Sequence, residues 1–222
     1  MDDARARRFR LIAFDWDGTL ADSTSIIADA IRAACGDVGA EVPDPVAARY
    51  VIGLGLADAL RHVAPSLPAA RHADLAARYR HHYLARDGEI PLFDGAVELL
   101  RELDDAGYFL AVATGKSRKG LDRALAHHGL ARRFHVTRTA DEGRPKPYPD
   151  MLHYLMATTG VTGTQTLMIG DTTHDLDLAR NAGAHSVAVN YGAHDAASLA
   201  AGLPLASIDS IAALRAWLAA NG

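Results

Sequence analysis

Two pairs of aspartates supply the side chains from which a catalytic site is built. Asp15 and Asp17 directly follow one short apolar run, and Asp171 and Asp175 follow another much later in the chain. Carboxylates can bind a hard cation, attack as nucleophiles or transfer protons. Carboxylates that lie close together disfavour each other's ionisation unless a cation offsets their charge. The pattern favours metal-assisted chemistry if the fold brings the two pairs together.

The alternation of strands and helices predicts an α/β fold that brings them together. Short apolar runs that end in Gly or Asp indicate buried strands at 11–14 and 166–171, and similar runs indicate strands at 108–113, 134–137 and 186–189. A weak edge strand is expected near 205–208. Helices are predicted over 23–37, 46–52, 57–63, 69–86, 96–106, 121–128, 150–159, 175–182, 196–201 and 210–220. Such alternation is typical of a Rossmann-like parallel sheet with helices on both faces, whose strand ends meet at one edge.

One connection in this pattern is too long. A strand–helix–strand unit needs about 30 residues, whereas the path from Asp17 to the strand near Tyr108 takes roughly three times that. The additional residues of this connection contain predicted helices only. We therefore expect an all-helical cap domain over residues 21–88, inserted after the first strand, and a catalytic core made of residues 1–20 and 89–222.

The shared strand edge also receives a hydroxyl and an ammonium. Thr114 follows the strand at 108–113, and Lys146 lies in a loop stiffened by prolines. Carboxylate oxygens without partnering His or Cys suit Mg²⁺ above all. A cationic site attracts phosphate, which Thr, Lys and free N–H groups can hold, and a carboxylate can attack phosphorus.

These residues fall into four motifs, and with them the chain resembles the haloacid dehalogenase superfamily, in particular its phosphoglycolate-phosphatase-like branch with a helical cap. The motifs, in chain order, are Asp15-Trp16-Asp17-Gly18-Thr19, Thr114-Gly115-Lys116, Lys146-Pro147-Tyr148-Pro149, and Gly170-Asp171 with Asp175. The resemblance covers essentially the whole chain. Trp16 stands where the family often has Phe, at a position that contributes its backbone.

The resemblance implies a role for each motif residue. It makes Asp15 the nucleophile that forms an aspartyl-phosphate, and Asp17 the acid that protonates the leaving oxygen and then activates water. It implies that Mg²⁺ is held by the Asp15 carboxylate, the Asp17 backbone carbonyl and the Asp171 carboxylate. It implies that Thr114 and Lys146 bind phosphoryl oxygens and that Asp175 is either a second-layer group or a water-mediated metal ligand. Gly115 and Lys116 are expected as second-layer or phosphate-binding groups, and Lys116 either contacts the phosphate or substrate or faces solvent at the start of a helix.

The expected activity is Mg²⁺-dependent hydrolysis of a small phosphate monoester, with 2-phosphoglycolate as the first substrate to test. A phosphomutase like β-phosphoglucomutase keeps all four motifs and stays open, as does a pyrophosphatase or nucleotidase of the same superfamily. Dehalogenases lack the second aspartate, so Asp17 argues against that reaction. A phosphonate-hydrolysing relative would need a cap lysine, and residues 21–88 contain none. Intact Asp15 and Asp17 argue against a non-enzymatic binding module.

Composition narrows the partners. The 222 residues are 49% hydrophobic, and the net charge of −4 argues against a nucleic-acid binder. The N-terminal apolar run is too short for a signal peptide or a membrane span, so a cytoplasmic protein without a membrane partner is expected. The expected partner is a small phosphorylated metabolite, and the oligomeric state is left as monomer or homodimer. The single Cys35 is expected to be buried.

Three features of the predicted cap allow two interpretations each. The segment Gly53-Leu54-Gly55 is either a plain turn or a loop that lines the substrate pocket. Arg49 and Arg61 either face solvent or meet an anionic part of the substrate. Asp22 is either a cap of the first helix, a role that Ser23 could fill equally, or a catalytic group.

Overall fold

The computed structural model describes residues 7–222 and centres on a six-stranded sheet with the order β3-β2-β1-β4-β5-β6. Every neighbouring pair of strands is parallel, which confirms the predicted fold class. The first six residues of the predicted core segment 1–20 lie outside the described residues. The strands are β1 Leu11–Phe14, β2 Phe109–Thr114, β3 Val136–Thr139, β4 Thr166–Gly170, β5 His185–Val189 and β6 Ser207–Ile208.

Helices cover the faces of this sheet and also form a group beside one of its edges. The α-helices are α1 Thr24–Asp37, α2 Pro45–Tyr50, α3 Leu56–Val63, α4 His72–Arg86, α5 Ala96–Asp105, α6 Arg118–His127, α7 Asp150–Thr159, α8 Thr173–Asn181, α9 Ala196–Ala201 and α10 Ile211–Asn221. Short 3₁₀ turns cover η1 Ala69–Arg71, η2 Asp87–Glu89 and η3 Gly163–Gln165. Within residues 7–222, none of the helices has the length and apolar character needed to cross a membrane.

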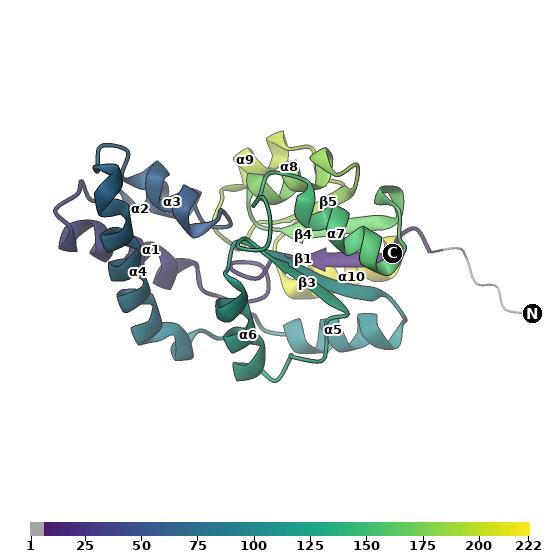
Figure 1. Cartoon of the computed structure of the whole chain (residues 1–222). Coiled ribbons are helices and arrows are strands. Elements are labelled where there is room, and N and C mark those ends of the chain that lie inside the picture. The colour runs from purple at the N-terminus through teal and green to yellow at the C-terminus, as the bar shows by residue number, and fades with distance from the viewer. Residues whose placement is uncertain (1–6) are drawn as a thin grey trace, which may run out of the picture.

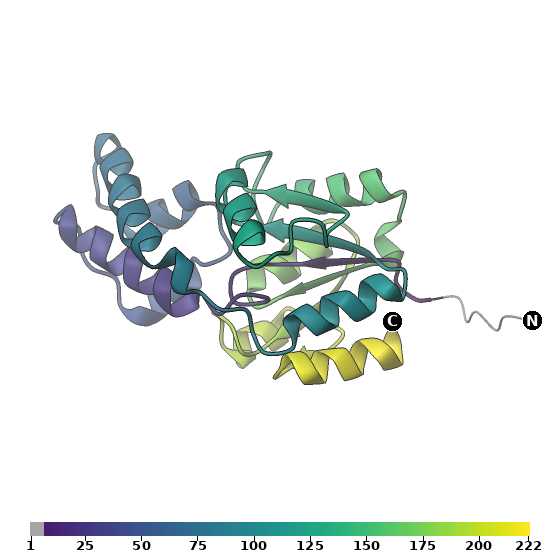
Figure 2. The same ribbon diagram turned by 90° about the horizontal axis from the view of Figure 1, so that it is seen from below.

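The central strand β1 is buried along its whole length because helices cover both faces of the sheet. Ile12 and Phe14 point to the core shared with α5 and α10, and Leu11 and Ala13 point to the core shared with α7 and α8. This alternation follows the two-residue period of a strand. Figure 2 shows α5 and α10 together on one side of the sheet. Chain order reverses between β1 and β4, where open α/β sheets bind their ligands.

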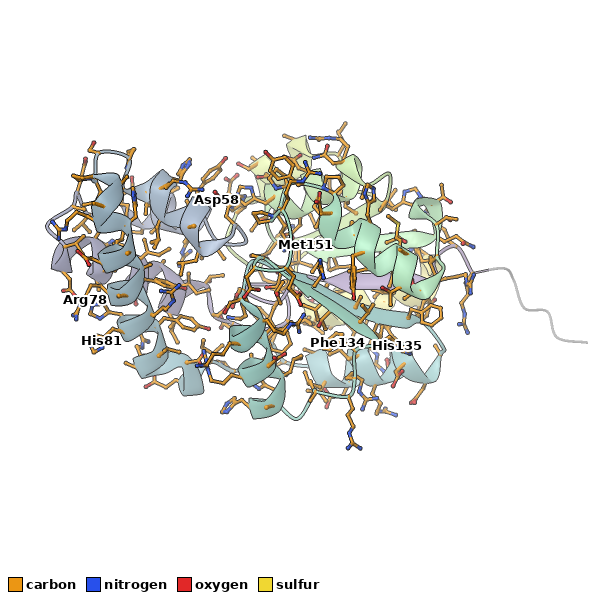
Figure 3. All side chains as sticks on the ribbon, in the orientation of Figure 1. Asp58, Arg78, His81, Phe134, His135 and Met151 are labelled. Carbon is orange, nitrogen blue, oxygen red and sulfur yellow. The ribbon has the colours of Figure 1, made fainter. Side chains whose placement is uncertain are left out.

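Residues 21–88, called the helical insertion from here on, contain α1 to α4 and lie beside the edge of the sheet at which β1 ends (Figure 1). The chain enters and leaves the insertion through adjacent segments. The Asp22 N–H donates to the Pro91 carbonyl at 3.0 Å, and the Phe93 N–H donates to the Leu20 carbonyl at 2.9 Å. Arg78 and His81 lie on the side of α4 that faces away from the core (Figure 3). Helix α4 packs against α1, and Arg78 also donates to Asp37 at the end of α1 at 2.6 Å.

Several element boundaries differ from expectation; the predicted helix 69–86, for example, begins with the 3₁₀ turn η1 and continues as α4 from His72. Two further differences have clear local reasons. Helix α6 begins at Arg118 instead of Leu121, because the Ser117 hydroxyl accepts the Gly120 N–H and supports a polar first turn. Strand β3 begins at Val136, opposite Ala111 of β2, instead of at Phe134. The predictions followed apolar residues, and both boundaries are set by hydrogen bonds.

The packing of α4 against α1 generates a stability prediction. Leu75 on α4 is fully buried, so Leu75→Ala should lower the free energy of unfolding by about 2–5 kcal/mol through a cavity. Leu84 on the same helix is 50% exposed, and Leu84→Ala should change it by less than about 1 kcal/mol. Urea denaturation followed by circular dichroism compares the two variants, and equal losses would contradict this packing.

Candidate active site

The first aspartate is fixed by the end of β1 and by its neighbour β4. The Asp15 N–H donates to the Ile169 carbonyl at 2.9 Å, which continues the pairing of the two strands by one residue. The chain then turns at Gly18, whose φ is +80°. A Cβ at Gly18 would also lie 2.1 Å from Asp171 Oδ2, so this position needs glycine for conformation and for space. The turn thereby brings the first motif against the fourth.

A buried lysine joins two of the carboxylates. Lys146 Nζ lies 2.9 Å from Asp15 Oδ1 and 2.5 Å from Asp175 Oδ1, and all three side chains are fully buried. Burial alone would lower the pKa of Lys146, but the charges of Asp15 and Asp175 outweigh it and raise that pKa. The lysine therefore stays charged and offsets part of the negative charge at the strand edge.

Asp171 and Asp175 are held by the segment between β4 and α8. Asp171 accepts the Thr19 hydroxyl at 2.8 Å on Oδ1 and the Ala193 N–H at 2.7 Å on Oδ2. Asp175 Oδ2 accepts both the N–H and the hydroxyl of Thr172, at 3.1 and 2.7 Å, so it also secures the start of α8. Burial, together with the charges of Asp15 and Asp175, raises the pKa of Asp171 well above its usual range.

The carboxylate cluster fits a hard cation. Oxygens of Asp15, Asp171 and Asp175 lie within 4.8 Å of one another, and all three residues are buried. Asp15 Oδ2 has no hydrogen-bond partner among residues 7–222. Burial raises the pKa of Asp15 to about 7; Lys146 acts in the opposite direction, and the charge of Asp175 adds to the rise. A divalent cation would neutralise this excess charge and occupy the free oxygen.

Asp17 lies beside the cluster in a less enclosed position and connects to the helical insertion. Its Oδ1 accepts the Ser23 hydroxyl at 2.7 Å and pairs with Lys116 Nζ at 3.0 Å. Lys116 also donates to the hydroxyl of Tyr83 on α4 at 2.8 Å. Tyr83 carries no signal of this contact in the sequence beyond its place on an apolar helix face. Ser23, one of the two candidate caps of α1, stands at the N-cap position, but its hydroxyl makes no capping bond and donates to Asp17 instead.

Thr114 and Gly115 lie at the end of β2, where Gly115 faces the loop 53–55 of the insertion. Thr114 ends β2, is fully buried, and accepts the Lys116 N–H on its hydroxyl at 3.2 Å. A Cβ at Gly115 would lie 2.5 Å from the Leu54 carbonyl oxygen and 2.6 Å from that of Gly53. The loop 53–55 therefore rests on the second motif, and glycine is needed there for space.

A cleft of about 620 Å³ opens from Asp17 between the insertion and the core. Its walls come from α1, the loop 53–55, α3 and α4 on one side, and from the segments after β2 and β3 on the other. The loop 53–55 thus lines a pocket, in line with the second of its two interpretations. Asp58, which lines the cleft from α3, lies on the side of the insertion that faces the core (Figure 3). Arg61 lines the cleft as well.

A second polar contact between insertion and core involves two histidines that sequence reasoning missed. His174 Nε2 and His194 Nε2 lie 3.0 and 2.9 Å from the same acceptor, the Tyr50 carbonyl oxygen. The Thr173 N–H donates to His194 Nδ1 at 3.1 Å, so Nε2 of His194 carries the proton that Tyr50 accepts. The Tyr50 ring stacks on His194 with 5.1 Å between centroids. This contact places the end of α2 against the start of α8 and the segment that follows β5.

Comparison with known proteins confirms the resemblance predicted from the four motifs. Residues 12–189 match the family model described as haloacid dehalogenase-like hydrolase. The chain is 35% identical over 206 residues to "Probable phosphatase IndB" of Dickeya dadantii, covering 90% of this chain and 89% of the relative. It is 33% identical to "Phosphoglycolate phosphatase" of Vibrio vulnificus, covering 94% and 95%. A crystal structure of a predicted phosphoglycolate phosphatase from Haemophilus somnus superimposes with a TM-score of 0.82 at 26% identity, covering 94% and 97%.

The close approach at Gly115 can be tested without an assay of activity. Gly115→Ala should lower the free energy of unfolding by about 1–3 kcal/mol, because the new methyl group displaces two backbone carbonyls. Hydrogen exchange at amides of residues 51–55 should become faster. Gly120→Ala is the matched control, since its Cβ would meet Ser117 Oγ at 3.3 Å and no backbone atom is nearer. Unchanged exchange in the loop of the Gly115 variant would contradict the contact.

Proposed function

We propose that this chain, which belongs to the haloacid dehalogenase-like hydrolase family, is a Mg²⁺-dependent phosphatase that hydrolyses phosphate monoesters of small metabolites. One observation carries the proposal: the buried Lys146 binds one oxygen of Asp15, and the other oxygen has no hydrogen-bond partner among residues 7–222, two positions before Asp17, which lines the cleft. The arrangement supports an oriented carboxylate nucleophile beside a cationic group that can bind phosphate.

Asp15 is the proposed nucleophile. Its carboxylate oxygen forms a bond to phosphorus as the bond between phosphorus and the ester oxygen breaks, which gives an aspartyl-phosphate and an alcohol. Asp17 gives its proton to the departing oxygen. In the second step, which hydrolyses the aspartyl-phosphate, Asp17 takes a proton from water and the resulting hydroxide attacks phosphorus. The bond between phosphorus and the Asp15 oxygen breaks, which frees Asp15 and releases inorganic phosphate. The same carboxyl thus acts first as an acid and then as a base.

The contacts of Asp17 support its proposed role in proton transfer. Ser23 and Lys116 hold its Oδ1, which leaves Oδ2 for proton transfer. The halide released by a dehalogenase needs no proton, so a second aspartate oriented in this way favours the hydrolysis of an ester. Lys146 and the Thr114 hydroxyl are the proposed ligands of the phosphoryl oxygens, where charge develops during transfer.

The metal site would use the carboxylates of Asp15 and Asp171 and the backbone carbonyl of Asp17. When bound, Mg²⁺ neutralises the charge that accumulates on the transferred phosphoryl group. Asp175 would act behind these ligands, because its two oxygens already bind Lys146 and Thr172. The name of the V. vulnificus relative places 2-phosphoglycolate among the esters to assay first.

Removal of the nucleophile tests the reaction. Asp15→Asn should reduce phosphate release from any substrate by about 10³-fold or more, because an amide cannot form the aspartyl-phosphate. Its melting temperature should not fall, since the substitution removes one of several clustered negative charges. Asp105→Asn on the exposed side of α5 provides a control with the same chemical change. Near wild-type turnover by the Asp15 variant would exclude the proposed mechanism.

Metal dependence offers a separate test with a readout besides activity. EDTA should abolish turnover and Mg²⁺ should restore it. Mg²⁺ should also raise the melting temperature of the substrate-free enzyme, by an amount equivalent to about 2.7 kcal/mol at a hundred times the Kd. This rise should be much smaller in Asp171→Asn. Hydrolysis that persists in EDTA, or an equal rise in both proteins, would contradict a Mg²⁺ site at these carboxylates.

A further inference from the structure

The walls of the cleft beyond Asp17 are largely apolar. Ile27 and Ile31 of α1 line it on one side, and Leu54 of the loop and Leu84 of α4 line it elsewhere. Tyr79 of α4 completes this wall, and its ring stacks on that of Tyr83 with 5.8 Å between centroids. Burial raises the pKa of Tyr79 above its ordinary value, which indicates surroundings of low polarity. An apolar group next to the phosphate would gain from burial here.

Three basic residues of the cleft are paired with carboxylates, and of these Lys116 has the most buried side chain. Lys116 pairs with Asp17 at 3.0 Å and donates to Tyr83. Arg61 is paired with Asp58 and Arg123 with Asp87.

The two remaining basic residues of the lining, Arg80 and Lys119, have exposed side chains at the rim. An ion pair made at such a position contributes little, because water screens it. Among residues 7–222, the cleft thus offers a second anion no buried cation without a carboxylate partner.

From these two features we propose that the cleft selects phosphate monoesters whose organic group is uncharged and apolar, of about the size of an aromatic ring, over esters that carry a second anion near the phosphate. The proposal rests on the phosphatase function above and narrows it. A carboxylate placed among these walls would lose water without gaining a partner, whereas an aromatic group would bury apolar surface. A cavity of about 620 Å³ also falls in the range that encloses ligands larger than a phosphate with two carbons.

Three alkyl phosphates separate size, apolarity and charge. We would measure kcat/KM of the full chain with Mg²⁺ for ethyl phosphate, benzyl phosphate and 2-phosphoglycolate. Benzyl phosphate should exceed ethyl phosphate by about tenfold or more, through the buried ring. 2-Phosphoglycolate should not exceed ethyl phosphate. The proposal is overturned if benzyl phosphate is no better than ethyl phosphate, or if 2-phosphoglycolate equals or exceeds benzyl phosphate.

Acetyl phosphate, an activated substrate, distinguishes failure of this proposal from failure of the reaction itself. If it is hydrolysed while the three esters show no preference, the reaction stands and the selectivity is wrong. If none of the four compounds is hydrolysed, the proposed phosphatase function is wrong as well.

A matched pair of variants tests the cause of the preference. Leu54→Arg adds a cation without a carboxylate partner to the wall, so the ratio of kcat/KM for 2-phosphoglycolate to that for benzyl phosphate should rise by about tenfold or more. Val46→Arg adds the same charge on α2, where the side chain is 77% exposed and outside the cleft lining, and should leave the ratio unchanged. Leu54→Ala, the smaller change, should lower the rate for benzyl phosphate alone. A ratio that moves equally in both arginine variants would overturn the proposal.

Discussion

The buried ion pairs of Lys146 are the interaction on which the rest of the site depends. A cluster of fully buried carboxylates is unfavourable, and one ammonium shared between Asp15 and Asp175 makes part of it tolerable. Asp175 uses its second oxygen to hold the start of α8, so the same residue links charge balance to the position of the segment after β4. Asp171 is fixed independently by Thr19 and Ala193. The residual charge of the cluster is what a bound cation would remove.

The helical insertion contributes two chemically different surfaces. At its base, polar contacts bind it to the core: Tyr83 reaches Lys116, and the Tyr50 carbonyl accepts from two histidines. Farther out, its side chains form the apolar wall of the cleft. The part of the insertion nearest the core is connected to Asp17, because Tyr83 contacts Lys116 and Lys116 pairs with Asp17. In the proposed mechanism, the insertion therefore orients the proton-transfer group Asp17 with one part and contacts the organic group of the substrate with another.

Sequence reasoning recovered the parts of this arrangement that local pattern encodes. Asp15, Thr114 and Asp171 lie at or directly after strand ends, and parallel strands bring such ends to one edge, so their meeting followed from the order of elements. The contacts of Tyr83, Tyr50 and His194 could not be predicted in the same way. They join positions that are 33 residues apart for Tyr83 and Lys116, and 144 apart for Tyr50 and His194. The periodicity of apolar residues does not predict which residues of an insertion contact the core. Ser23 shows in addition that a residue suited to capping a helix can donate to another partner, here Asp17.

The missing side chain at Gly115 has a consequence for how this protein can diverge. Its backbone lies against the carbonyls of Gly53 and Leu54, in a loop some sixty positions earlier in the chain, and any larger residue would force that loop away. The second motif and the loop 53–55 therefore cannot change independently of each other. A chimera that receives its insertion from a relative therefore needs a loop whose backbone follows the same path past Gly115. New substrate ranges are then most accessible through the side chains of the walls, which can change without moving the backbone beneath them.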